Sequence, residues 1–352
     1  SGVFIKYAVE FADAQLKVSN DVLAGDICID GDVSVRMSRG TAGTTFEITL
    51  YDLPEPKVQA LADTLTGEAK PQLTIKLGYF DTSVQQMLTG IYESVESSAD
   101  SDKLVTKIKG REAAFFACAT TKYTQSFTGD LKYTDIVNQL LSTAKFTAGQ
   151  VATTVQTDDS LPADPLHNPV FRSDKVLNIL DEVAERANAE LMIVDGKVFL
   201  ASPIRYDSVP AAALDRSANL ATFQPFTREI PDADKLNFPN PVPAIKITGF
   251  RFTVVGDPTM RPGQQVSVEN VKGYDSSANP EFRIRQVEHI YSSSAGYTCV
   301  GVATIRLKDG AQARQIDSAA ERSAASVARD VGTQIRKQAF DNPNIEIAAI
   351  KA

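Results

Sequence analysis

The chain has 352 residues and carries 36 Lys and Arg against 44 Asp and Glu, a net charge of −8. This length predicts roughly two or three domains, and 43% hydrophobic residues are enough for real cores. Because no block of basic residues occurs, the composition disfavours a protein that follows nucleic-acid phosphates. We find no charged-then-apolar leader and no apolar run near the ~18 residues of a membrane span. We therefore expect neither export nor membrane insertion, and we expect the protein to be present first in the cytoplasm of a cell.

Alternating apolar residues predict a first antiparallel β domain, a barrel or sandwich, over residues 1–112. The segment Pro56–Thr66 interrupts the alternation with apolar residues at helical spacing, which predicts a helix over one sheet or barrel end. The alternating positions are Val33, Val35 and Met37; Phe46, Ile48 and Leu50; Leu73, Ile75 and Leu77; and Leu104 and Ile108.

Mixed periodicity over residues 113–203 predicts a small α/β domain. Thr134 and Ser173 are candidate N-caps of two helices, each with one apolar stripe. Asp195-Gly196 lies between two apolar runs, the strongest short signal for a two-residue β-hairpin. Residues 204–243 have little periodicity, and the prolines at 225, 231, 239, 241 and 243 punctuate the segment, which predicts a linker or crossover.

Residues 244–310 predict a second β domain, again a small antiparallel barrel or sandwich. Turns are indicated at Gly256–Pro258 and Pro262–Gly263, where the chain needs fixed or permissive φ angles. The apolar alternation changes phase between Ile284 and Val287, which predicts a β-bulge near Gln286.

Residues 311–352 predict a C-terminal helix with a thin apolar stripe, followed by a strand that has no return strand. We therefore expect this tail to contact another chain, with the strand adding to a partner's sheet edge. The predicted interface residues are Ile316, Val327, Val331, Ile335, Ile345, Ile347 and Ile350.

Cys28, Cys118 and Cys299 are far apart, odd in number and never in a C-x-x-C pair. This spacing argues against a disulfide framework and against a zinc site, so we expect reduced, mostly buried thiols. We expect no bound metal and no cofactor.

The sequence offers little for catalysis. His167 stands in a proline-rich loop and His289 in a predicted strand, and neither belongs to a metal or nucleophile motif. The carboxylate pairs Asp158-Asp159 and Asp232 with Asp234 could serve a glycosidase, but adjacent loop carboxylates are usually solvated, and the chain has no Trp for sugar stacking. Gly40–Gly43 lacks the Lys-Ser/Thr of a phosphate loop, which favours a turn. We expect a protein that is not an enzyme.

The order of a β domain, a small α/β domain and a second β domain resembles the baseplate hub family of contractile phage tails and injection systems. This family includes the late control protein D group and the hub half of type VI secretion spike proteins. The motifs that carry the resemblance are G-x-P at Gly256–Pro258, P-G-Q at Pro262–Gln264, and V-E-H at Val287–His289 followed by G-Y. The resemblance spans nearly the whole chain and rests on the order and spacing of these motifs.

The resemblance implies a structural protein that forms a homotrimer with two tube-like β domains in each chain. Such a trimer joins a six-fold tail tube to a three-fold central spike and lines the delivery channel. A faint internal echo, IYESVE at Ile91–Glu96 and IRQVE at Ile284–Glu288, is compatible with two similar domains. Because the chain stops at Ala352, where fused relatives continue into the spike, we expect a separately encoded spike docked on Ile345–Ile350.

The resemblance also implies neighbouring baseplate wedge proteins as partners, DNA or protein cargo only in transit, and a place in a virion baseplate or injection particle assembled in the host cytoplasm. The acidic balance would suit a channel through which DNA slides, or would simply keep the protein soluble. An alternative function is a peripheral, adhesin-like binding module of the tail. A peptidoglycan-cleaving tail enzyme is the least favoured reading.

Overall fold

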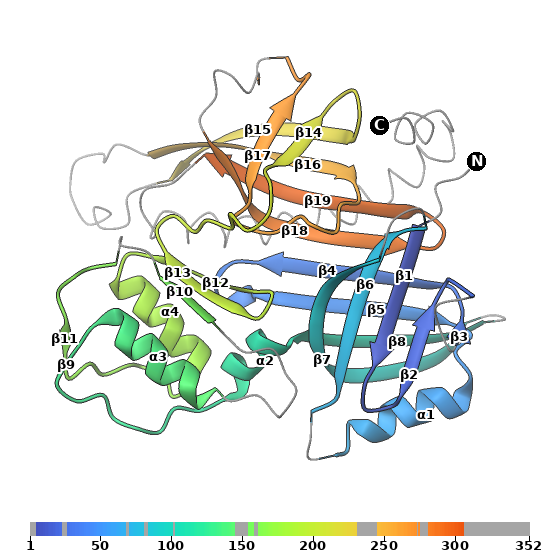
Figure 1. The fold of residues 1–352 in the computed structure, drawn as a ribbon, viewed down its shortest axis with the longest axis horizontal. Helices are drawn as coiled ribbons and strands as arrows, with labels where there is room; N and C mark the ends of the chain where they lie inside the picture. The colour runs from blue at the N-terminus through green and yellow to red at the C-terminus, as the bar shows by residue number, and fades with distance from the viewer. Residues whose placement is uncertain are drawn as a thin grey trace.

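The computed structural model describes residues 5–22, 27–67, 70–80, 84–100, 103–144, 154–157, 161–230, 245–272, 274 and 281–305. The fold is mainly β, as predicted, and the described part holds four α-helices. Figure 1 shows a first β module, an α/β module beside it, and a second β module across both.

The first β module contains eight strands and one helix among the described residues. Its strands are β1 (Ile5–Phe11), β2 (Leu16–Ser19), β3 (Ile27–Cys28), β4 (Gly31–Ser38), β5 (Thr44–Tyr51), β6 (Gln72–Tyr79), β7 (Gln85–Asp100) and β8 (Lys103–Glu112). A short 3-10 turn, η1 (Gly40–Ala42), links β4 to β5. Helix α1 (Glu55–Thr64) follows β5 and buries Leu61, so the predicted helix is confirmed. The predicted alternation is confirmed in β4, β5 and β6, where every second residue is buried.

The second β module contains β14 (Ala212–Asp215), β15 (Leu220–Ile230), β16 (Ile245–Val255), β17 (Gln265–Glu269), β18 (Phe282–Ser292) and β19 (Gly296–Ile305). The predicted bulge is confirmed, because the register of β18 against β19 shifts between Ile284 and Gln286. The tight turn before β19 uses Gly296 at φ 93°, a conformation that glycine adopts without steric cost.

The segment 204–243, which we predicted as a linker, carries β14 and β15 instead. Pro225 lies inside β15 and pairs with Phe250 of β16. A proline is tolerated there because β15 is the outermost strand of its sheet, where a missing N–H costs no ladder bond. The prolines at 231, 239, 241 and 243 lie outside the described residues. The second β module therefore begins before the predicted boundary at residue 244.

The strands of both β modules belong to one 14-stranded sheet. Its main path is β15-β16-β19-β18-β4-β5-β8-β7-β6-β1-β2-β3, with β17 paired to β18 and β14 to β17. The modules join where β18 runs antiparallel to β4, with Gln286–Ser292 opposite Asp32–Ser38. The two predicted β segments thus share their hydrogen-bonded framework.

Four strands of each β module repeat in the same order. The path β4-β5-β8-β7 in the first module corresponds to β15-β16-β19-β18 in the second. Phe46 pairs with Gly110 on β8, and Phe250 pairs with Ala303 on β19. The register of β7 against β8 shifts between Tyr92 and Ser94, as that of β18 against β19 does at the IRQVE segment. The faint sequence echo therefore marks equivalent bulges.

The α/β module lies between the β modules in the chain. Its elements are α2 (Ala113–Thr120), β9 (Asp130–Leu131), α3 (Tyr133–Thr143), β10 (Thr154–Thr157), β11 (Leu166–His167), α4 (Val176–Arg186), β12 (Glu190–Val194) and β13 (Lys197–Ala201). The predicted hairpin is confirmed: β12 and β13 are antiparallel, and Asp195 and Gly196 both have positive φ, as a type I′ turn requires.

Both predicted helices are present, but neither predicted N-cap is correct. Lys132 and Lys175 precede α3 and α4 directly, and neither helix has a side-chain cap. Thr134 lies inside the first turn of α3. Ser173 lies too early to cap α4, and its hydroxyl instead accepts a hydrogen bond from the Lys175 N–H.

The β12–β13 hairpin connects two hydrophobic cores. Met192 and Phe199 pack into the core that runs through both β modules. Ile193 and Val198 face the opposite way, into the core that α2, α3 and α4 cover. Because both faces of the hairpin are buried, it fixes the α/β module against the β sheet.

Gly110 and Ala303 occupy equivalent positions in the two β modules, but we expect only the Ala303 position to tolerate a methyl side chain. A Cβ at Gly110 would overlap the Ile91 carbonyl oxygen and lie 2.7 Å from Tyr92 Cα, whereas Ala303 is accommodated in β19. We expect Gly110→Ala to lower the free energy of unfolding by about 1–3 kcal/mol through overpacking. The matched change, Ala303→Gly, should cost about 0.5–1 kcal/mol. Urea denaturation of both variants checks this, and an equal or smaller loss for Gly110→Ala would contradict it.

Candidate functional site

The junction of β18 with β4 is held by polar side chains on the solvent side of the sheet. Ser34 donates a hydrogen bond to Glu288 Oε1 at 2.8 Å, and Arg36 Nη2 donates to Glu288 Oε2 at 3.2 Å. The backbone N–H of Ser293 donates to Asp32 at 3.2 Å. One carboxylate of the second module is thus shared by two side chains of the first.

Three charged side chains are buried at the inner end of this junction. Arg39 follows β4, Arg285 is the bulged residue of β18, and Glu190 begins β12. Glu190 Oε2 accepts from Arg39 and from Arg285, the latter at 2.9 Å, and Arg39 also donates to the Ile284 carbonyl at 3.1 Å. Burial would raise the pKa of Glu190, but the two guanidinium groups together lower it. The ionised triad therefore connects all three modules.

His289, which lies in a strand as predicted, is fully buried beside Cys299 and Tyr297. Its Nε2 lies 3.1 Å from the Met260 carbonyl and must donate to it, so Nδ1 accepts from the Tyr297 hydroxyl at 2.9 Å. Burial, aided by Arg261, lowers the pKa of His289 to about 3, and burial raises the pKa of Cys299 to about 12. This histidine–cysteine pair is neutral at pH 7 and holds no thiolate for nucleophilic attack.

A second buried acid, Glu112, lies where the three modules meet. Its Oε1 accepts from the Gly196 N–H at 2.6 Å, and its Oε2 is buried without a hydrogen-bond partner among the described residues. Nearby, Asp195 pairs with Arg261 Nε at 2.8 Å and accepts from the Tyr206 hydroxyl. Glu112, Asp195 and Arg261 border a cavity of about 260 Å³. Burial raises the pKa of Glu112 to about 8; Asp195 also raises it and Arg261 lowers it.

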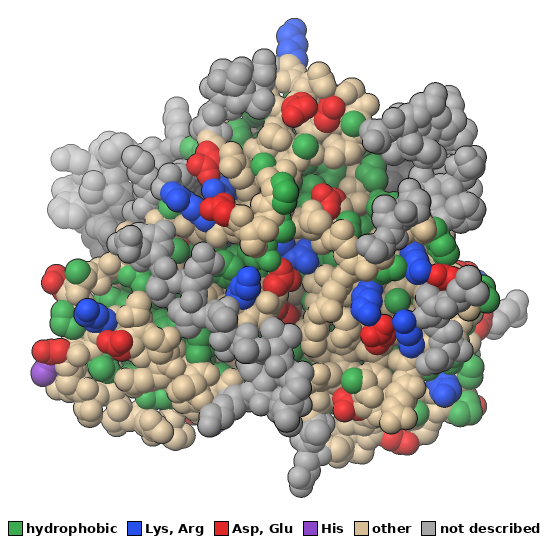
Figure 2. Space-filling model, in the orientation of Figure 1, with side chains coloured by type: hydrophobic (Ala, Val, Ile, Leu, Met, Phe, Trp, Pro, Cys, Tyr) green, Lys and Arg blue, Asp and Glu red, His purple; other side chains and the backbone are tan. Residues whose placement is uncertain are grey.

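The solvent side of the sheet forms a groove of about 670 Å³ across β18, β4, β5, β8 and β7. Its walls contain four acidic residues (Asp32, Glu47, Glu93 and Glu288) and three basic residues (Arg36, Lys109 and Arg111). Arg36 pairs with Glu288, Lys109 with Glu47, and Arg111 with Glu93. Figure 2 likewise shows positive and negative side chains close together on the visible face. The excess of acidic over basic residues is not concentrated in this groove. Both explanations of the negative net charge, a channel through which DNA slides and solubility, remain predictions.

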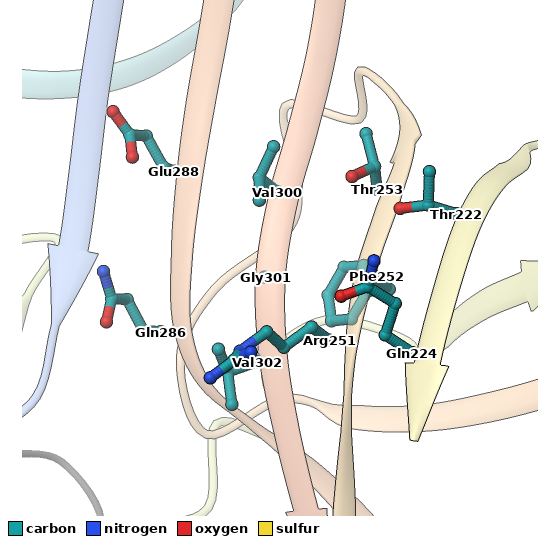
Figure 3. Close-up of a pocket in the computed structure, with 10 residues that line it drawn as sticks. All are labelled: Thr222, Gln224, Arg251, Phe252, Thr253, Gln286, Glu288, Val300, Gly301 and Val302. Carbon is teal, nitrogen blue, oxygen red and sulfur yellow. The ribbon is translucent and has the colours of Figure 1, made fainter. Parts of the chain in front are cut away.

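The same side of the second module carries a smaller pocket, of about 20 Å³ (Figure 3). Thr222 and Gln224 of β15 line it beside Arg251 of β16, and Val300 and Val302 of β19 form its floor. The pocket extends along the sheet face to the outer strand β15.

Several stretches of this sheet have a pairing partner on one side only, among the residues that the structure describes. The short strands β3 and β14 are two of them, and the longest are β15 and part of β7. β15 lies at one end of the main path of the sheet and pairs with β16. In β7, residues up to Ile91 pair with β6, but Ser94–Ala99 pair only with β8. Such edges present backbone N–H and C=O groups that can pair with another chain.

The residues that we predicted to contact a partner, Ile316, Val327, Val331, Ile335, Ile345, Ile347 and Ile350, all lie outside the described residues, as do Asp158-Asp159, Asp232 and Asp234. His167 is exposed, with Nδ1 2.7 Å from Asp130. Cys118 and Cys299 are buried, as expected, but Cys28 is exposed, and all three are free thiols. Sequence reasoning missed the two open edges, although the echo at Ile91–Glu96 points to one of them.

Within the described residues, no group of three or more His, Cys, Asp or Glu is placed to hold a metal ion. In the same part of the chain, none of the helices has the length and apolarity to cross a membrane.

Comparisons with protein-family models and with curated proteins found no match. Among solved structures, the tail protein from Neisseria meningitidis MC58 is similar, with a TM-score of 0.57 and 12% identity over 87% of this chain and 98% of its own. The 43 kDa tail protein of prophage MuSo2 from Shewanella oneidensis has a TM-score of 0.55 and 11% identity over 86% and 98%.

A third similar structure is an E. coli component of the type VI secretion system that is itself described as similar to the T4 bacteriophage tail proteins gp27 and gp5. Its TM-score is 0.52, with 10% identity over 80% of this chain and 75% of its own. At such identities the likeness shows the fold alone. The chain has the fold of phage tail proteins and of a type VI secretion component.

The raised pKa of Glu112 predicts a pH-dependent stability. An acid with a higher pKa in the folded than in the unfolded state stabilises the fold below its unfolded pKa and loses that contribution as the pH rises to its folded pKa. Stability should therefore fall between about pH 4.5 and pH 8 through this group. We expect Glu112→Gln to flatten this dependence and, at pH 9, to be more stable than the parent by about 1–3 kcal/mol.

Thermal unfolding from pH 5 to pH 9 of the parent and of Glu112→Gln measures the effect. Glu47→Gln, an exposed change on the same module, is the matched control and should keep the parental profile. Parallel pH profiles for the parent and Glu112→Gln would contradict the assignment.

Proposed function

We propose that this chain is the structural baseplate hub of a contractile tail or injection machine, a homotrimeric adaptor that joins the six-fold tail tube to the three-fold central spike and lines the delivery channel. Its proposed partners are a second and third copy of itself, the tail tube protein, the spike protein and neighbouring baseplate wedge proteins. DNA or protein cargo would pass through without a dedicated binding site.

The observation that carries this proposal is the repeat of β4-β5-β8-β7 as β15-β16-β19-β18 within one sheet. A chain with two equivalent modules presents two equivalent surfaces, so three chains would present six. Such an arrangement can meet a six-fold ring on one side while it remains three-fold on the other. The fold shared with tail proteins supports the same reading.

The chemistry of the buried groups supports a structural rather than a catalytic role. The neutral pair His289 and Cys299 is sealed in the core, and in the Arg39–Glu190–Arg285 triad both guanidinium groups pair with the Glu190 carboxylate between modules. Both arrangements contribute to rigidity, which a load-transmitting ring requires. We also propose the particle to which this chain belongs, which is either a virion baseplate or an injection device.

Light scattering coupled to size exclusion tests the proposal. The purified chain alone should have the mass of a trimer, and a mixture with the spike protein encoded beside it should elute as one complex. A chain ending at Ile305 is the matched variant: it should still form the trimer but should lose the spike, because the predicted docking residues follow that point. A monomer that ignores the spike would overturn the hub and favour the peripheral binding module.

A further inference from the structure

One chain already contains a complete example of how two of its modules join. β18 of the second module pairs antiparallel with β4 of the first, with Tyr291 opposite Val33 and Ile290 opposite Ser34. Both sides of this joint have an equivalent elsewhere in the chain. Those equivalents follow from the strand registers alone.

The bulges align β7 with β18. Ser94 and Gln286 are each the first residue after the bulge, so Ser98 corresponds to Ile290 and Ala99 to Tyr291. The partner strands align β15 with β4 in the same way, because Thr49 on β5 corresponds to Thr253 on β16. Phe223 therefore corresponds to Val33, and Gln224 to Ser34.

We propose that the open edge of β7 in one copy pairs with the open edge of β15 in a second copy, in the register of the β18–β4 joint, so that Ser98 lies opposite Gln224 and Ala99 opposite Phe223. This inference rests on the proposed function, because it names the surface through which the trimer forms. It adds the strands, the direction and the register.

Side-chain sizes fit this register on the core side of the sheet. In the β18–β4 joint, a large residue, Tyr291, meets a small one, Val33, and both are buried. In the proposed joint the order is reversed, since the small Ala99 meets the large Phe223. Ala99 is exposed and Phe223 is half-buried in the single chain, so each has surface left to bury. On the solvent side, Ser98 and Gln224 form a polar pair.

Backbone direction fits as well. The Ser38 N–H bonds Gly43 on the β5 side, so alternation directs the backbone groups of Val35 towards β18. Pro225 on β15 corresponds to Val35 on β4, so its backbone nitrogen points towards the second copy. It cannot donate, but its carbonyl can accept, so the proposed ladder loses a single bond. Proline at such an edge also discourages unregistered pairing with other strands.

The proposed joint is head to tail, because each copy offers one β7 edge and one β15 edge. Contacts of this kind generate either closed rings or open filaments, depending on the rotation at each step. A closed ring of three chains requires the rotation between the two modules of a chain and the rotation between copies to add up to one third of a full turn. If the two rotations are also equal, all six joints of the ring are equivalent.

Disulfide trapping tests the register directly. Ser98 and Gln224 would form a pair without mutual hydrogen bonds, whose Cα atoms lie ~4.5 Å apart, within reach of a disulfide. We expect the full chain with Cys28→Ser, Ser98→Cys and Gln224→Cys to run as a covalent trimer on a non-reducing gel after mild oxidation. Cys28→Ser removes the exposed native thiol, while Cys118 and Cys299 are buried.

The matched control moves one cysteine two residues along β15, as Cys28→Ser with Ser98→Cys and Thr222→Cys. That diagonal spans ~7–8 Å, so it should give little or no cross-link. Equal cross-linking in both variants would overturn the register. A trimer by light scattering without a Ser98–Gln224 cross-link would overturn this joint and leave the proposed hub standing, whereas a monomer would overturn both.

Discussion

The antiparallel pairing of β18 with β4 is the constraint on which the rest of this architecture depends. It turns two similar β modules, far apart in the chain, into one continuous sheet. It also brings Arg285 and Arg39 within reach of Glu190, so the α/β module is held by a charge that only the joined modules can neutralise. A buried carboxylate is tolerated where its partners are all present, and removal of any one would leave an uncompensated charge.

The α/β module is held in two chemically different ways. Its β12–β13 hairpin is packed on both faces, which provides hydrophobic attachment without a directional requirement. The triad and the hydrogen bond from Gly196 to Glu112 provide direction at either end of that hairpin. Packing therefore supplies the attachment, and the polar contacts fix how the module is oriented.

Much of the local structure was predictable because its signals are local. The alternation in β4 and β5, the Asp195-Gly196 turn and the bulge in β18 each follow from residues within a few positions. The joined sheet was not predictable, because Ser34 and Glu288 meet across a separation of 254 residues and no short pattern records that pairing. β15 was missed because Pro225, read without a neighbour, indicates a linker, whereas on an edge strand it is tolerated. The candidate site was predicted at the C-terminal tail, but the open edges depend on strand order, which only the three-dimensional structure provides.

The separation between β4 and β18 has a consequence for biosynthesis. The first module emerges from the ribosome roughly 250 residues before the strand that completes its edge, which at about 5–20 residues per second is a wait of tens of seconds. During that time β4 is an unpaired edge of a nearly finished sheet. Asp32, Ser34 and Arg36 alternate along its solvent side, and charged side chains on an edge discourage pairing with nascent neighbours. The groups that later bind Glu288 and Ser293 thus protect the edge while it waits for its own chain.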